Sequence, residues 1–282
     1  MTNRRVLQAR SARRPIGRRP LLAGAASALF LPLVDERVAA AFGEAGAFNA
    51  RLLLAGKASD IGPRALAPAR WGRELVRRTS APARSSNDSV RIDRPALFRE
   101  PFGVWCGSAD VGALSATELR FLEKYLKLGG MLVVDDADPR SKAFGRSARR
   151  EIQRVLPESP PVRLDAAHVL YKTFYLLDRP VGRVLGPPYV EAIVRGKSAQ
   201  VLFLEHDLLG ALAQEGEGWA LPLEPASGDD GSGGGRMHWF ADQRERAIRF
   251  AVNIAMYALC SDYKDDVVHA PYILKRRGRR VP

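Results

Sequence analysis

Apolar positions along residues 47–260 fall into two alternating patterns. Short uniform apolar runs are typical of strands covered on both faces, whereas apolar residues three and four apart indicate amphipathic helices. The uniform runs predict strands over residues 47–54, 101–106, 131–134, 190–194 and 200–204. The helical stripes predict helices over residues 68–79, 116–128, 147–156 and 242–260. Strands that alternate with helices indicate an α/β protein with a largely parallel sheet.

The clearest unit runs from Phe102 to Asp135. Ser115 with Glu118 three residues later forms a capping box that begins a helix. Gly129 and the glycine after it end that helix, and a short apolar strand follows. Asp135 and Asp136 stand where this strand stops. Because ligands of open α/β sheets bind outside the carboxyl ends of the strands, the two aspartates lie at the edge where a site is expected.

Three segments between these elements are less regular. Residues 80–89 and 227–235 have the composition of polar loops, and residues 157–161 contain three prolines that break the chain. Residues 168–177 are apolar and aromatic, and their pattern fits a helix as well as a strand.

The first 41 residues have the organisation of an export signal. Paired arginines precede a modestly apolar stretch over residues 21–34, and three alanines follow at 39–41. Arg18 and Arg19, directly before Pro-Leu-Leu, resemble a twin-arginine signal. The apolar stretch is shorter than the ~20 residues that span a bilayer, which favours cleavage near Phe42 over an uncleaved anchor. A basic N-terminus without signal function is the alternative.

The formal net charge of +13 is concentrated at the two ends of the chain. Eight arginines stand against two acids in residues 1–41, and five basic residues lie in residues 275–280. About +2 therefore remains for the body, so a nucleic-acid partner is not expected. We predict a signal segment over residues 1–41, a single α/β domain over 42–274 and a basic tail over 275–282.

Two groups of side chains at predicted strand ends are candidates for a ligand site. Asp135 and Asp136 can hold a hard cation or act as acid and base, or they can cap the following turn. Glu205, His206 and Asp207 follow the strand over 200–204 and would meet the aspartates at the same sheet edge if both strands are parallel. Since neighbouring side chains on a strand point to opposite faces, the three cannot all converge. Asp207 as a helix N-cap is an equally good interpretation.

Other motifs with known chemistry are missing from the sequence. It contains no Cys or His pair at zinc spacing, no Gly-rich phosphate loop and no Gly-x-Ser-x-Gly elbow. The acidic cluster over residues 262–269 suits either a metal site or a solvated turn. Cys106 and Cys260 lie in apolar runs and are expected to be buried free thiols. We assign no metal, and the sequence leaves the cofactor unknown.

Four segments together resemble one bacterial family, the domain-of-unknown-function family numbered 4159. They are residues 98–102, Leu-x-x-Gly-Gly-x-Leu-x-x-Asp-Asp over 126–136, residues 168–177 and residues 253–266. The resemblance extends from about Phe48 to Lys275, and Asp-Tyr-Lys-Asp-Asp at 262–266, followed by His269-Ala270-Pro271, is its most specific part.

The resemblance implies a flavodoxin-like three-layer sandwich similar to class I glutamine amidotransferase-like domains. That broader group uses a cysteine in a Gly-x-Cys-x-Gly elbow, whereas here Asp135 and Asp136 follow the corresponding strand. We therefore expect a periplasmic protein without amidotransferase activity that binds a small ligand or an envelope protein. Membrane contact is expected only through an uncleaved signal segment. The alternative is a metal-assisted hydrolase that uses the strand-end carboxylates.

Overall fold

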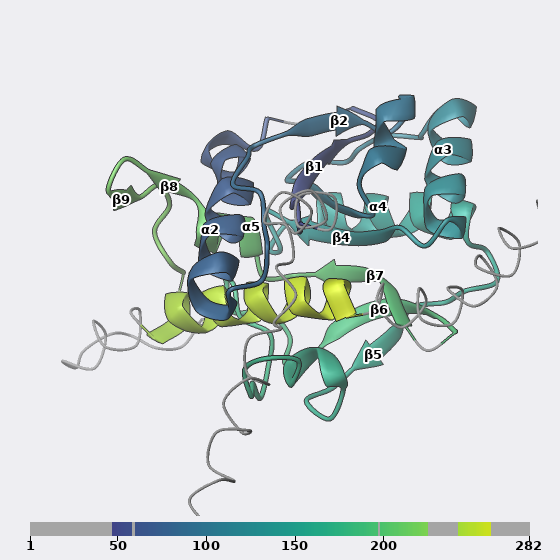
Figure 1. Cartoon of the computed structure of the whole chain (residues 1–282). Helices are drawn as coiled ribbons and strands as arrows, with labels where there is room; N and C mark the ends of the chain where they lie inside the picture. Colours follow the sequence, from purple (N-terminus) through teal and green to yellow (C-terminus); the bar gives the residue numbers. More distant parts are fainter. Residues whose placement is uncertain (1–46, 58–59, 197, 225–241, 261–282) are drawn as a thin grey trace, which may run out of the picture. The chain divides into compact units, whose positions relative to one another are not determined.

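The computed structural model describes residues 47–57, 60–196, 198–224 and 242–260 (Figure 1). Within these residues, seven strands form one sheet in the spatial order β2-β1-β3-β4-β7-β6-β5, and β8 pairs with β9 separately. The strands are β1 (Arg51–Leu54), β2 (Ser89–Arg91), β3 (Phe102–Gly107), β4 (Met131–Asp136), β5 (Val162–Leu164), β6 (Val190–Arg195), β7 (Ser198–Leu204), β8 (Gln214–Glu215) and β9 (Gly218–Trp219).

Five neighbouring strands of the sheet, β2, β1, β3, β4 and β7, run parallel to one another. β6 is antiparallel to β7, and the edge strand β5 is antiparallel to β6. The register places Cys106 opposite Asp135 and Asp135 opposite Leu204. The predicted α/β class with a largely parallel sheet is confirmed, and the carboxyl ends of β1, β3, β4 and β7 meet at one edge.

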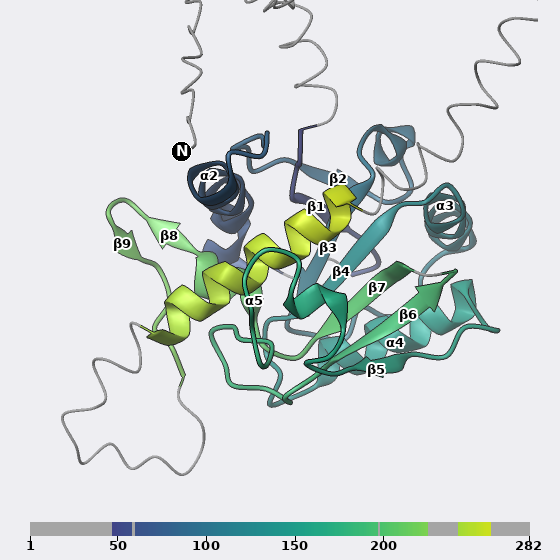
Figure 2. The same ribbon diagram turned by 60° about the horizontal axis from the view of Figure 1, so that its bottom comes forward.

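Helices cover both faces of this sheet. They are α2 (Ala67–Thr79), α3 (Ala116–Lys127), α4 (Ala143–Val155), α5 (Leu208–Leu212) and a helix over residues 242–260, with short 3₁₀ segments η1 (Gly62–Leu66), η2 (Pro95–Arg99) and η3 (Val169–Tyr171). Figure 2 shows the helix over 242–260, in yellow, crossing the sheet on the face opposite α4. Among the described residues, no helix is both long and apolar enough to cross a membrane.

Alternate residues of each strand supply two separate apolar cores. Val133 belongs to the core beneath α2 and the helix over 242–260, and Val134 belongs to the core beneath α3 and α4. Trp71 joins the two helices of the first face, because its fully buried ring donates a hydrogen bond of 2.8 Å from Nε1 to the Ala251 carbonyl. The uniform apolar runs of the sequence follow from this burial on both faces.

Several predicted elements have different limits in the structure. The first strand begins at Arg51 instead of residue 47, and the helix predicted to begin at residue 147 begins at Ala143. The predicted loop over 80–89 leads directly into β2, which was not predicted, and β5, β8 and β9 were missed as well, whereas α5 was anticipated only through the N-cap interpretation of Asp207. The missed strands have two or three residues and α5 has five, which is too short to show a period. Residues 168–177 contain η3 and turns in place of a long helix or strand.

The predicted signal segment with Arg18 and Arg19, the loop over 227–235, the acidic cluster over 262–269 and the basic tail lie outside the described residues. These four assignments remain predictions.

Candidate functional site

Asp135 and Asp136 end β4 and point to opposite faces of the sheet. Asp135 accepts hydrogen bonds from the backbone N–H groups of Leu208 (2.9 Å) and Leu209 (2.7 Å), at the start of α5. Asp136 accepts from Asp138 (3.0 Å) and from Gly145 (3.1 Å) in α4. Both carboxylates are almost completely buried. Each therefore holds the beginning of a helix, and the two do not form a pair.

Asp207 lies beside Asp135 on the face of α2. It has a left-handed backbone (φ 51°, ψ 61°) between β7 and α5, and its side chain accepts from the Gly210 N–H at 3.0 Å, which confirms its role as an N-cap. Two arginines from distant segments bind the same carboxylate. Arg64 contacts it through Nε and Nη2, both at 2.6 Å, and Arg183 contacts it through Nε.

This cluster changes the protonation of Asp135. Burial, reinforced by the negative charge of Asp207, raises the pKa of Asp135 to about 8, while the two backbone N–H donors oppose the shift. Burial also raises the pKa of Asp136 above the ordinary value for aspartate. Two guanidinium groups form ion pairs with the Asp207 carboxylate. The two carboxylates of the cluster are buried, the two arginines are only slightly exposed, and Arg183 also pairs with Glu224, so the charges are balanced largely within the fold.

Glu205 lies on the other face of the sheet, apart from Asp207. Its carboxylate accepts from Arg149 Nη2 at 2.8 Å, and the same guanidinium contacts Glu191 at 3.1 Å and lies over the ring of Phe203 at 5.1 Å. Glu205 also lines a small hollow of about 20 Å³ with Tyr189 and other residues of this edge. The negative charge of Glu205 is therefore paired with Arg149 within the fold.

His206 turns toward the segment that precedes β6. Its ring is 1% exposed, and Nε2 lies 2.8 Å from the Pro187 carbonyl oxygen, which assigns the proton to Nε2. Its Nδ1 has no hydrogen-bond partner among the described residues. Burial, with the nearby positive charge of Arg179, lowers the pKa of His206 to about 4, so the ring is neutral at physiological pH.

Cys106 ends the apolar part of β3, directly opposite Asp135 in the register. Burial and the charges of Asp135 and Asp207 raise the pKa of its thiol well above the ordinary value. A thiolate is therefore disfavoured, and Cys106 is not an activated nucleophile. Both cysteines are free as expected, but Cys260 is exposed and the prediction that it is buried is wrong.

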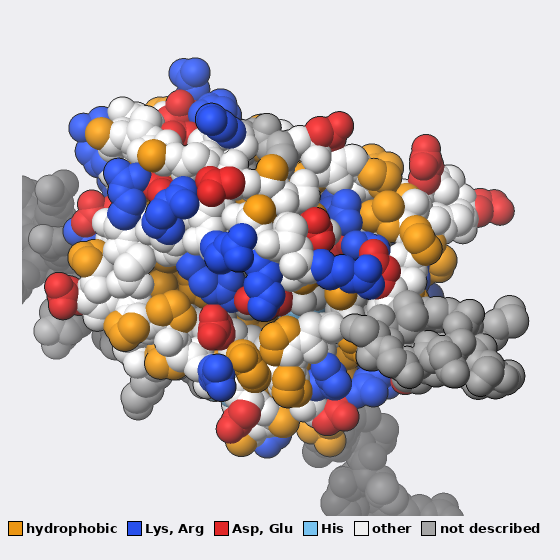
Figure 3. Space-filling view, turned by 180° about the vertical axis from the view of Figure 1, so that it is seen from behind, with side chains coloured by type: hydrophobic (Ala, Val, Ile, Leu, Met, Phe, Trp, Pro, Cys, Tyr) orange, Lys and Arg blue, Asp and Glu red, His pale blue; other side chains and the backbone are white. Residues whose placement is uncertain are grey.

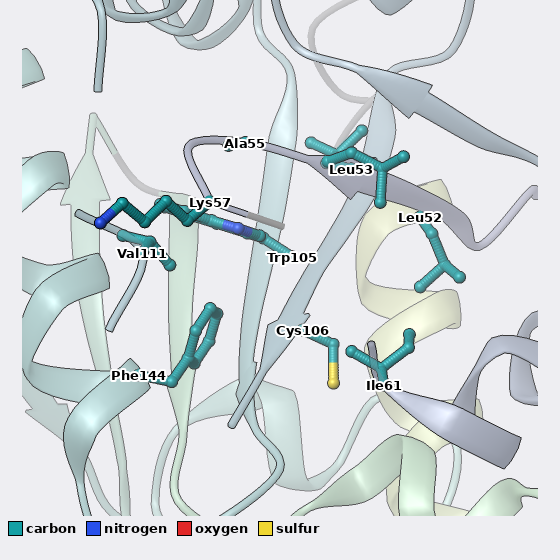
Figure 4. Close-up of a pocket in the computed structure, with 10 residues that line it drawn as sticks. Leu52, Leu53, Ala55, Lys57, Ile61, Trp105, Cys106, Val111 and Phe144 are labelled. Carbon is teal, nitrogen blue, oxygen red and sulfur yellow. The ribbon is translucent and has the colours of Figure 1, made fainter. Parts of the chain in front are cut away.

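A small hollow opens between the carboxyl ends of β1 and β3. Figure 4 shows Cys106 and Ile61 at one end of it, Trp105 and Phe144 along the wall, and Lys57 with Val111 at the other end. Its free volume is about 30 Å³, which is room for about two water molecules. β1 is flanked by β2 on one side and β3 on the other, so the strand order reverses at this point. Such reversal points are the usual ligand crevices of open α/β sheets.

The predicted site residues do not form a metal centre. Among the described residues, no group of three or more His, Cys, Asp and Glu side chains has an arrangement that could hold a metal ion. The structure brings Asp135 and Asp207 together and places Asp136, Glu205 and His206 elsewhere.

Figure 3 shows that basic and acidic side chains are interspersed on the face seen from behind.

One protein family matches residues 51–259, a range that contains all seven strands of the sheet. The chain belongs to this family, the domain of unknown function DUF4159. The match is shorter than the resemblance inferred from the sequence and ends before the Asp-Tyr-Lys-Asp-Asp segment. No curated protein matches the chain.

The arginine partners of the strand-end acids in this DUF4159 domain were not predicted from the sequence. Arg64, Arg183 and Arg149 come from η1, a loop and α4, and nothing in their local sequence distinguishes them from the many other arginines. The hollow was missed for a different reason. Its position depends on β2, whose three residues fix the point where the strand order reverses.

Proposed function

We propose that the mature chain is an exported DUF4159 domain that binds a small ligand in the hollow between β1 and β3 and has no amidotransferase activity. The position of this hollow at the reversal of strand order carries the proposal. Its lining is mostly apolar, as is usual for ligand sites. The strand-end acids are engaged in internal contacts, which leaves the hollow as the better candidate at this sheet edge.

The order of the parallel strands supports a flavodoxin-like fold. Numbered along the chain, the five parallel strands lie in the order 2-1-3-4-5, which is the flavodoxin-like order. This order agrees with the amidotransferase-like architecture that the family resemblance implies. The missing activity follows from the chemistry at the strand ends, because β4 ends in two helix-holding aspartates and the thiol at the end of β3 is protonated.

Ligand binding is tested with methyl NMR of the full chain and a small-fragment set at millimolar concentration. We expect shift changes centred on the methyl groups of Ile61, Val111 and Leu53, which line the hollow. The control is Ala55→Leu, because Ala55 also lines the hollow and a larger side chain would fill it. Shift changes that avoid these methyl groups, or that persist unchanged in the variant, would place binding elsewhere.

Export is supported by the paired arginines, the apolar stretch over 21–34 and the alanines at 39–41. N-terminal sequencing of the protein from fractionated cells tests it. We expect a periplasmic form that begins near Phe42, and a full-length form confined to the cytoplasm would refute export.

A metal-assisted hydrolase is the alternative function, and the geometry supports it less well. Asp135 and Asp136 lie on opposite faces, and each accepts two backbone N–H bonds. Metal analysis of the purified protein separates the two proposals. Stoichiometric metal that is lost in an Asp135→Ala variant that remains folded would favour the hydrolase.

A further inference from the structure

The hollow between β1 and β3 has an apolar interior and a single charged side chain in its lining. From these features we infer that its ligand is a short aliphatic carboxylate, with the aliphatic part in the hollow and the carboxylate at the ammonium group of Lys57. The inference rests on the proposed ligand-binding function and adds the chemical class of the ligand.

The positive charge of Lys57 favours a ligand that carries a negative charge. Lys57 is exposed, and its ammonium makes no hydrogen bond or ion pair within the described part of the chain. No acid lines the hollow. The nearby Asp110 interacts electrostatically with Lys57, but its carboxylate makes its direct contacts with Arg150 at 3.4 Å and with the Gly112 N–H at 2.7 Å. An anionic group on a ligand would therefore meet an available cation.

The shape of Lys57 matches this arrangement. Figure 4 shows its aliphatic stem lying beside Val111 and its nitrogen at the end farthest from Cys106. Lysine commonly lays its methylene groups along apolar surface and keeps the ammonium in water. An aliphatic acid placed in the hollow would thus have its carboxylate at the solvent side, beside this ammonium.

The rim of the hollow limits the size of the ligand. The Lys57 N–H donates to the Val111 carbonyl at 2.9 Å, and the Gly56 N–H donates to Glu118 Oε1 at 2.8 Å. Gly56 has a positive φ of 57°, and a side chain at this position would overlap the Val111 carbonyl. A rim fixed by these contacts does not widen easily, so the hollow admits an unbranched chain of about two carbons and is too small for a nucleotide.

The experiment compares propanoate with its neutral analogue propanamide, both titrated into the full chain and followed by methyl NMR. We expect the acid to bind up to about fivefold more tightly at low salt, because an exposed ion pair contributes modestly, and we expect added salt to reduce this preference. Lys57→Met keeps the aliphatic stem and should make the two affinities equal. Lys172→Met, an exposed lysine in the turn after η3, is the matched control and should keep the preference.

Three outcomes separate this inference from the proposed function. Equal binding of acid and amide to the wild-type hollow, with both lost in Ala55→Leu, would overturn the carboxylate preference and leave ligand binding intact. No shift of the hollow's methyl groups with either compound would overturn the inference. Failure of the fragment set there as well would remove the proposed function. If Ala55→Leu does not fold, Val111→Phe fills the same hollow from another lining position.

Discussion

His206 makes the stability of the protein depend on pH in a way that can be calculated. The folded protein holds a neutral ring, because burial and Arg179 lower its pKa to about 4 from 6.5. A lowered pKa in the folded state contributes stability above the unfolded value, and this stability is lost as the pH falls toward the folded value. His206→Gln removes the titrating group and keeps a side-chain N–H that can reach the Pro187 carbonyl.

The size of the effect follows from the two pKa values. Relative to pH 8, linkage predicts that the wild type loses about 2 kcal/mol at pH 5 from this histidine, and about 3.4 kcal/mol when the ring is fully protonated. Asp135 acts in the opposite direction over part of this range. Its raised pKa favours the folded state at low pH, and this contribution is lost as the pH rises toward 8. Because both proteins contain Asp135, its contribution cancels in the difference between them.

Urea denaturation of the wild type and His206→Gln at half-unit steps from pH 8 to pH 5 measures this difference. We expect the free energy of unfolding of the wild type to fall by about 2 kcal/mol relative to the variant, mostly below pH 6.5. His168→Gln is the control, because that ring is only half-buried and should give a smaller slope. A difference that stays constant from pH 8 to pH 5 would show that the pKa of His206 is the same in the folded and the unfolded protein, and would refute the lowered pKa.

Three further predictions concern the same sheet edge. Asp207→Ala should lower the free energy of unfolding by about 3 kcal/mol in urea denaturation, because it leaves Arg64 without its carboxylate and Arg183 with Glu224 alone; a loss below 1 kcal/mol would contradict this. Gly107→Ala should cost about 1–3 kcal/mol in thermal or urea unfolding, since the new methyl group would overlap the ring of Phe144, and adding Phe144→Leu should restore part of the loss. A thiol reagent at pH 7.5 should modify Cys260 rapidly and Cys106 slowly in the folded protein, as counted by mass spectrometry, and equal rates would contradict the protonated state assigned to Cys106.

The long elements of the fold could be predicted because their patterns extend over several turns or a whole buried strand. The capping box at Ser115 is present as predicted, with the Glu118 N–H donating to its hydroxyl. β4 was predicted from four apolar residues that are buried on both faces. β2 and β5 were missed because a three-residue strand is defined by its neighbours in the sheet, which the local sequence does not specify.

The candidate site was predicted only in part. Sequence reasoning placed Asp135 and Asp207 at one sheet edge, and the structure brings them together. It could not anticipate that arginines from segments 143 and 24 positions away would bind Asp207. The contacts that neutralise a buried acid are long-range, so the type of acid at a strand end does not reveal whether it is available to a ligand.

The two aspartates at the end of β4 also act as a mechanical joint between the layers. One carboxylate fastens the start of α5 on one face, and its neighbour fastens the start of α4 on the other. A shift of β4 by one residue would exchange the faces of the two side chains and release both helices together. The alignment of two helical layers thus depends on the register of one strand, and Phe144, which lines the hollow, belongs to the helix held by Asp136.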